Sequence, residues 1–195
     1  KNLAQAIVGF SSAYLKLKPD FILILGDRYE ILAAAISATI SKIPIIHLHG
    51  GELTIGAYDD AFRHAITKMS HIHFAAADQY KERIIQLGEH PQNVFCVGGL
   101  GVDSIEQTTL LNKDELCEAL GIKLNQRSLL VTYHPETLGI NGIPDDVSEL
   151  LTALDLLDQT TICFTMPNAD NDSSQIIEKI QKYVCNRNDT YFFKS

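Results

Sequence analysis

A repeated alternation of short apolar runs and longer amphipathic segments constrains the fold of this chain more than any other feature. Phe21–Leu25 is an uninterrupted apolar run that ends at Gly26-Asp27, the pattern of a parallel strand buried on both faces. Apolar residues recur at three- and four-residue steps over Leu3–Leu17, and Glu30–Ser41 is rich in Ala and Ile, so both segments predict helices. Strands that alternate with helices predict βαβ units and a parallel sheet.

The same alternation continues to the end of the chain. Further strands are expected at Pro44–His49, His71–Ala75, Val94–Val97, Ser128–Thr132, Thr161–Thr165 and Tyr191–Lys194. Further helices are expected at Asp60–Met69, Asp78–Leu87, Lys113–Leu120, Asp145–Leu157 and Ser173–Val184. A more polar stretch follows Gly98-Gly99, which places a domain boundary near residue 105. The sequence therefore predicts an α/β protein with two Rossmann-type parallel-sheet domains, residues 1–105 and 106–195.

Composition and charge limit the function classes. With 195 residues, 46% of them hydrophobic and 21% charged, the chain is expected to be globular with a sizeable core. A formal net charge of -8 argues against a nucleic-acid partner, because phosphate binding usually requires a basic face. No apolar run approaches the roughly 20 residues that span a bilayer, and no signal peptide is recognisable. A cytoplasmic location without a membrane partner is therefore expected.

The cysteines and the first residue carry two further expectations. The four cysteines are far apart, form no CxxC motif and fall mostly in apolar stretches. This pattern favours buried, reduced thiols over disulfides or a zinc site. The chain begins at Lys1 inside a predicted helix, so we expect it to be part of a longer protein.

Polar residues gather directly after the predicted strands. Asp27-Arg28 follows the first strand, His49-Gly50-Gly51-Glu52 follows the second, and Asp59-Asp60 begins the next helix. In the second domain, Tyr133–Glu136 and Pro167–Asp170 follow strands in the same way. Ligands of open parallel sheets bind beyond the carboxyl ends of the strands. We therefore expect a site at this edge, in a cleft between two domains.

Several of these residues have two interpretations. Asp27 either caps the following helix or does chemistry, and Arg28 beside it is suited to neutralise a pyrophosphate. Gly50-Gly51 either marks a turn or lets the backbone approach a ligand closely. Asp59 is expected to be a helix N-cap, which would leave Asp60 free to face the cleft.

The histidines raise the question of a metal. His47 and His49 alternate along one predicted strand, as do His71 and His73, so each pair could chelate an ion. No cysteine accompanies them and the carboxylates lie in loops, so neither a metal nor a cofactor is expected. His71 and His73 are interpreted as structural. His134, at a strand end, is the better functional candidate because it can donate hydrogen bonds to phosphate.

Three motifs together carry a family resemblance. They are Gly26-Asp27-Arg28-Tyr29-Glu30, His47-Leu48-His49-Gly50-Gly51-Glu52 and the ten residues from Asp59 to Lys68, followed by Gly98-Gly99, His134-Pro135 and Pro167–Asp170. In this order and spacing they resemble the hydrolysing UDP-N-acetylglucosamine 2-epimerases of bacterial sialic-acid pathways and the epimerase half of the animal bifunctional enzyme. The resemblance covers essentially the whole chain.

The resemblance implies a GT-B-like fold with UDP in the interdomain cleft. Residues 1–105 would be the C-terminal part of the N-terminal domain, and residues 106–195 the N-terminal part of the UDP-binding domain. It also implies elimination of UDP to give 2-acetamidoglucal, followed by hydration with inversion at C2 to N-acetylmannosamine. The implied partners are a nucleotide-sugar substrate and further copies of the protein, in a dimer or tetramer.

The resemblance also assigns site residues. Asp27, Asp59 and Asp60 match catalytic acidic positions, and His134 matches a histidine that faces the diphosphate. Where relatives have a catalytic Glu, this chain has His49, so either Glu52 takes that role or His49 is itself the acid–base group. The remaining expected substrate-binding residues are Arg28, Gly50, Gly51, Arg63 and His64.

Four alternatives stay open. The same reaction on UDP-2,4-diacetamido-2,4,6-trideoxyglucose, as in legionaminic-acid synthesis, would use the same motifs. A GT-B glycosyltransferase would need an acceptor and would leave the carboxylates without a purpose, and a silent nucleotide-sugar-binding module would not turn over. The non-hydrolysing epimerases typically carry Glu-Ala-Gly where this chain has His49-Gly50-Gly51, which favours hydrolysis.

Overall fold

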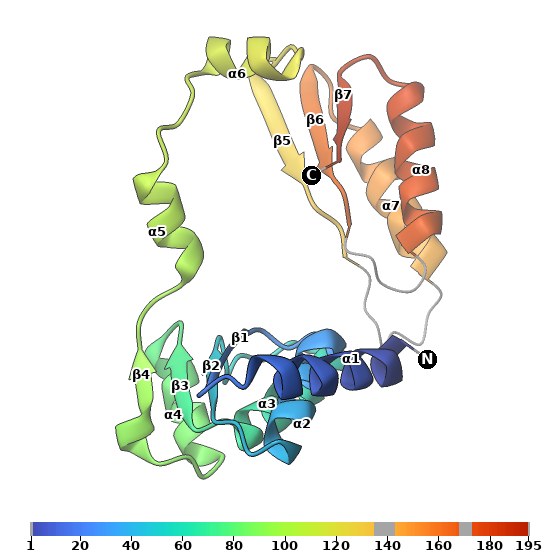
Figure 1. Cartoon of the computed structure of the whole chain (residues 1–195). Coiled ribbons are helices and arrows are strands. Elements are labelled where there is room, and N and C mark those ends of the chain that lie inside the picture. The colour runs from blue at the N-terminus through green and yellow to red at the C-terminus, as the bar shows by residue number, and fades with distance from the viewer. Residues whose placement is uncertain (1, 135–142, 168–172, 195) are drawn as a thin grey trace. The chain divides into compact units, whose positions relative to one another are not determined.

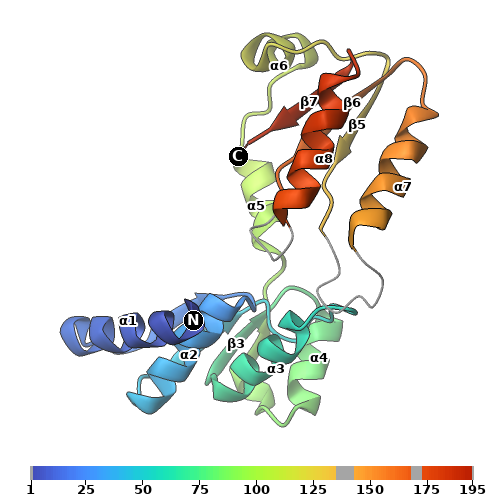
Figure 2. The same cartoon turned by 90° about the vertical axis from the view of Figure 1, so that its right-hand side faces the viewer.

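The computed structural model describes residues 2–134, 143–167 and 173–194. The chain divides into two compact units, Lys1–Thr108 and Thr109–Ser195 (Figures 1 and 2). Helix α5 (Leu100–Gln107) closes the first unit, and the expected boundary near residue 105 falls inside it. This helix was not predicted, because the glycines at its start and the polar residues that follow indicate a linker.

A parallel sheet forms the centre of the first unit. Its strands β1 (Ile22–Leu25), β2 (Ile45–Leu48), β3 (Ile72–Ala75) and β4 (Val94–Cys96) lie in chain order. One row of residues crosses all four strands in register and is buried throughout: Ile24, His47, His73 and Val94. Two histidines therefore lie side by side in the interior of the sheet.

Helices alternate with these strands, as the pattern predicts. They are α1 (Asn2–Leu17), α2 (Tyr29–Ile40), α3 (Asp59–Met69) and α4 (Asp78–Gln86), and the short 3-10 turn η1 (Pro91–Asn93) precedes β4. Helix α2 contributes Ala33, Ala35 and Ala38 with no exposed surface. Small side chains let the helix backbone approach its neighbours closely, so the Ala-rich sequence of α2 matches its place in the main core.

The second unit repeats the architecture on a smaller scale. Strands β5 (Arg127–Val131), β6 (Thr160–Thr165) and β7 (Thr190–Phe193) form a parallel sheet in that order. Its helices are α6 (Lys113–Leu120), α7 (Ile143–Asp155) and α8 (Ser173–Cys185). The core of this unit consists of buried residues from α7, β6 and α8: Val147, Leu154, Ile162, Phe164, Ile176 and Ile180.

The expected elements and the α/β class are confirmed, whereas the expectation about the cysteines is wrong in part. Cys163 is buried, but Cys96 and Cys185 are exposed, and all four thiols are free. Cys96 lies on β4, an edge strand with little cover, and Cys185 is the last residue of α8. Among the described residues, no helix has the length and apolar character to cross a membrane.

Candidate active site

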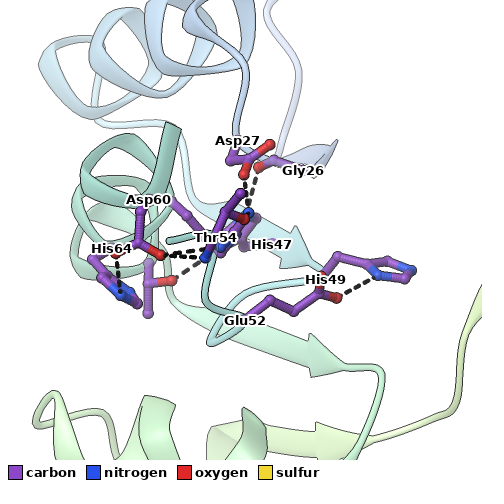
Figure 3. A network of polar contacts seen from close by, with 10 residues as sticks. Gly26, Asp27, His47, His49, Glu52, Thr54, Asp60 and His64 are labelled. Carbon is purple, nitrogen blue, oxygen red and sulfur yellow. Dashed lines mark hydrogen bonds and ion pairs between the residues drawn. The ribbon is translucent and has the colours of Figure 1, made fainter. Parts of the chain in front are cut away.

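The carboxyl end of β1 is tied to β2 by a buried histidine. Gly26 leaves the strand with a φ of 82°, and its N–H donates to the Leu48 carbonyl at 3.1 Å. The Gly26 carbonyl accepts from His47 Nε2 at 2.9 Å (Figure 3). Asp27 comes next in the chain, so His47 fixes the backbone from which the Asp27 side chain projects.

His47 is a structural residue in its neutral form. Its side chain has no exposed surface, and donation from Nε2 leaves Nδ1 as the acceptor facing Thr67 Oγ1 at 3.4 Å. Burial lowers the pKa of His47 from 6.5 to about 4, against the opposing effect of the Gly26 hydrogen bond. Both ring nitrogens have protein partners, so His47 is not available to chelate a metal together with His49.

Arg63 on α3 joins two of the expected catalytic carboxylates. Its guanidinium donates to Asp27 Oδ2, to Thr54 Oγ1 at 2.8 Å and to Asp60 Oδ1 at 3.4 Å. The Arg63 side chain is only 7% exposed, compared with 20% for Asp27 and 32% for Asp60. A buried guanidinium thus orients two carboxylates that remain partly open to solvent. We call Arg63, Asp27, Thr54 and Asp60 the Arg63 network.

Asp60 has further partners on the same side of α3. Its Oδ1 accepts from the Thr54 N–H at 2.8 Å, and its Oδ2 lies 3.6 Å from His64 Nε2 (Figure 3). Its neighbour Asp59 is the first residue of α3 and not its N-cap, so the expected capping role is wrong. Tyr58 occupies the N-cap with helix-like backbone angles, because the preceding turn already leads the chain into the helix.

The expected capping role of Asp27 is also not found. The N-cap residue of α2 is Arg28, which makes no side-chain capping bond, and Asp27 is paired with Arg63 instead. The Arg28 side chain is 39% exposed, and its Nε lies 3.4 Å from Glu30 Oε2.

His49 and Glu52 form a second polar pair beyond the end of β2. His49 Nδ1 lies 2.8 Å from Glu52 Oε1, and their side chains are 28% and 30% exposed. His49 has a φ of 61°, in the left-handed region that residues with a side chain rarely adopt. Figure 3 shows this pair pointing away from the Arg63 network.

The two glycines between His49 and Glu52 pack closely against His47 and Tyr80. A Cβ on Gly50 would lie 3.0 Å from His47 Nδ1, and one on Gly51 would lie 2.3 Å from the Tyr80 carbonyl oxygen. The Gly51 carbonyl accepts from Arg83 Nη1 on α4. The glycines are therefore required for the turn to fit between β2 and α4. Sequence reasoning missed this contact, because nothing in the pattern links the turn to Arg83.

The structure also describes His134 and His71. His134 is exposed and belongs to the second unit, in the loop that follows the end of β5 at Val131. The positions from Pro135 to Glu136 and from Asn168 to Asp170 lie outside the described residues. His71 Nδ1 accepts from the Ile45 N–H at 3.3 Å, as a structural histidine would.

His73 is the second histidine of the buried row. Burial lowers its pKa, although Glu89, with Oε2 at 3.3 Å from Nε2, opposes the shift.

Within the described ranges, no group of three or more His, Cys, Asp or Glu side chains is arranged to hold a metal ion. Thr54 and Thr67, which bind Arg63 and His47, were not predicted, because an isolated threonine carries no spacing signal.

The chain matches a known protein family along almost its whole length. The family described as UDP-N-acetylglucosamine 2-epimerase matches residues 1–194. The chain is 44% identical over 188 residues to "GDP/UDP-N,N'-diacetylbacillosamine 2-epimerase (hydrolyzing)" of Campylobacter jejuni, covering 96% of this chain and 49% of that protein. It is 36% identical over 184 residues to "UDP-N,N'-diacetylbacillosamine 2-epimerase (hydrolyzing)" of Legionella pneumophila, covering 94% and 48%.

A solved structure shows the same fold. The crystal structure of Methanocaldococcus jannaschii UDP-GlcNAc 2-epimerase in complex with UDP-GlcNAc and UDP matches with a TM-score of 0.80 at 16% identity, covering 98% of this chain and 54% of that one. The likeness confirms the expected GT-B-like class with Rossmann-type sheets. The chain spans about half the length of the curated relatives it matches.

Proposed function

The chain belongs to the hydrolysing UDP-N-acetylglucosamine 2-epimerase family, and on that premise we propose that the protein carrying it converts a UDP-2-acetamido sugar to the free C2 epimer and UDP. The C2 proton and UDP leave first, which creates a C1=C2 double bond. Water then adds across that bond, with its oxygen at C1 and a proton at C2 on the opposite face. With UDP-N-acetylglucosamine the products are UDP and N-acetylmannosamine.

The observation that carries this proposal is the pair of carboxylates held by Arg63. Removal of a weakly acidic C–H proton requires a well-oriented base, and a carboxylate that cannot rotate away meets that requirement. Asp27 and Asp60 come from two separate elements, yet the same guanidinium fixes both. We assign Asp27 as the base of the elimination step, with Asp60 beside it, and Asp59 as a further acidic residue of the site.

Arg63 itself takes a different role from the one the resemblance implies. Its donors are directed at Asp27, Asp60 and Thr54, and its side chain is nearly buried, so we assign it as a positioning residue and not as a substrate ligand. Arg28, Gly50, Gly51, His64 and, in the second unit, His134 remain the proposed substrate-binding residues. An exposed arginine and histidine are suited to phosphate oxygens.

Two observations bear on the substrate. The family description names UDP-N-acetylglucosamine, which is our first candidate. The relatives from C. jejuni and L. pneumophila are named for N,N'-diacetylbacillosamine, the 2,4-diacetamido-2,4,6-trideoxy sugar, which makes its UDP derivative the second candidate. A coupled assay of the whole protein on both nucleotides separates them, since turnover of the diacetamido sugar alone would overturn the first assignment.

The reaction class is tested by product analysis in heavy water. NMR should show free UDP and a free amino sugar that carries deuterium at C2, because the new C2 proton comes from the medium. A UDP-bound epimer would indicate the non-hydrolysing reaction. Transfer that depends on an acceptor sugar, or binding without turnover, would contradict the proposal in favour of a glycosyltransferase or a silent binding module.

A further inference from the structure

The position of Asp27 depends on its main chain as well as on its side chain. Arg63 binds the carboxylate, but the carboxylate is only as well placed as the backbone that carries it. The preceding residue is Gly26, with a left-handed φ of 82°, and glycine restricts the backbone least of all residues. Because a misplacement of about 1 Å can cost about 10²-fold in rate, this backbone must be fixed by another contact.

His47 on β2 provides that contact. Its Nε2 donates to the Gly26 carbonyl at 2.9 Å (Figure 3). The Gly26 carbonyl and the Asp27 nitrogen belong to one planar peptide group, so the hydrogen bond fixes the plane from which Asp27 starts. The His47 side chain has no exposed surface, and a Cβ on Gly50 would lie only 3.0 Å from its Nδ1. The ring is therefore enclosed and directed at Gly26.

Thr67 on α3 determines which ring nitrogen of His47 carries the proton. Thr67 Oγ1 lies 3.4 Å from His47 Nδ1, and both side chains are fully buried. A neutral imidazole has one donor and one acceptor nitrogen, so donation from the hydroxyl to Nδ1 leaves the proton on Nε2. Burial lowers the pKa of His47 to about 4, which keeps the ring neutral at neutral pH.

Helix α3 reaches Asp27 by two routes. Asp60, Arg63 and Thr67 follow one another at three- and four-residue steps, so they lie along one face of the helix. Arg63 binds the side chain of Asp27, whereas Thr67 acts on its main chain through His47 and Gly26. A single helix thus fixes both the carboxylate and the backbone of the proposed base.

We propose that His47 is a positioning residue for the elimination step, which holds the main chain of Asp27 in its reactive position, and that Thr67 selects the tautomer this requires. The inference rests on the proposed function, in which Asp27 accepts the C2 proton. His47 has no exposed surface, so it does not touch the substrate, and it exchanges no proton during the reaction. It acts through Asp27 alone.

The proposal is tested in the whole protein by the kinetics of UDP release. His47→Leu should lower kcat about 10- to 100-fold while KM changes less than about twofold, because the substrate-binding groups stay in place. His47→Gln should recover most of the lost rate, since its side-chain amide can still donate to the Gly26 carbonyl. His73→Leu is the matched control, because His73 is equally buried in the same row and has Glu89 as its neighbour; its kcat should be unchanged.

Two further measurements separate a positioning role from a purely structural one. Added to Asp27→Asn, His47→Leu should cause no further loss of kcat, because His47 acts through Asp27. Losses that multiply would overturn the proposal. Thr67→Val, which removes the hydroxyl and keeps the shape, should lower kcat by up to about 10-fold, and Thr67→Ser should keep the rate. An unchanged kcat in Thr67→Val would overturn the role of the tautomer.

Failure of the inference is distinguishable from failure of the proposed function. A wild-type protein that releases no UDP from either nucleotide would overturn the proposed function itself. If the wild type is active and His47→Leu loses no more kcat than His73→Leu, or His47→Gln recovers nothing, only the positioning role is overturned. Thermal unfolding shows whether each variant is folded, and Thr67→Val tests the same contact if His47→Leu does not fold.

Discussion

Around Arg63, three polar partners converge on one nearly buried side chain, whereas His49 and Glu52 pair with each other and remain partly exposed. Both groups lie beyond the carboxyl ends of β1 and β2, and both join a cation-forming side chain to a carboxylate. The two groups differ in how deeply their charged side chains are buried. The Arg63 network is an ionic cluster with a buried centre, and the His49–Glu52 pair is a surface contact held by a rigid turn.

This difference indicates which group should matter for stability and which for chemistry alone. Removal of one partner of a buried ion pair leaves an uncompensated charge, so it is costly. An exposed pair contributes little to folding, because water replaces the lost partner. Four predictions test this contrast.

Asp27→Asn should lower turnover of the whole protein about a thousandfold, because the amide cannot accept the C2 proton. UDP binding should be retained, as isothermal calorimetry would show. Asp20→Asn, at an exposed residue that precedes β1 at the opposite end of the strand from Asp27, is the control. Unchanged turnover with Asp27→Asn would remove the Arg63 network from the reaction.

Arg63→Met should destabilise the protein by about 3 kcal/mol, because Asp27 and Asp60 lose their shared cation while Met keeps the buried volume. Urea denaturation monitored by circular dichroism measures the effect. Arg63→Lys should recover part of the stability, since the charge returns without the three-way geometry of the guanidinium. A cost for Arg63→Met below that of an ordinary surface substitution would contradict the assignment of a buried ionic centre.

His47 should make the protein sensitive to acid. Its pKa is lowered from 6.5 to about 4 in the folded state, so only the unfolded state takes up the proton as the pH falls through this window. Stability should be fully present above pH 6.5 and should fall by about 2 kcal/mol between pH 6.5 and 5, with the buried His73 acting in the same direction. The variant His49→Gln should keep this slope. Loss of the slope in His49→Gln would mean that the exposed histidine carries the sensitivity.

Glu52→Gln should change the free energy of unfolding by less than about 1 kcal/mol, because the His49–Glu52 pair is partly exposed. Urea denaturation of the variant beside Arg63→Met gives the direct comparison. Equal costs for the two variants would show that the His49–Glu52 turn supports the fold as much as the Arg63 network does, and the proposed contrast would fail.

The two histidines of β2 show how far the sequence could be interpreted. Their spacing predicted two rings on one face of a strand, suited to a shared ligand. In the structure His47 is a fully buried donor to Gly26, while His49 leaves the strand with a left-handed backbone and contacts Glu52. The two-residue repeat places side chains on one face only while the strand continues, and it does not show at which residue the strand ends.

Sequence patterns alone were enough to predict the alternation of strands and helices, the parallel sheets and the positions of Asp27, His49, Glu52 and Asp60 beyond the strand ends. These follow from local hydrophobic patterns and from the geometry shared by all parallel sheets. The partners of these residues became known from the folded chain: Arg63 binds Asp27, 36 residues away, and Arg83 binds the Gly51 carbonyl. Such pairings depend on the rotation of each helix against the sheet and on close packing between distant segments, which no local pattern encodes.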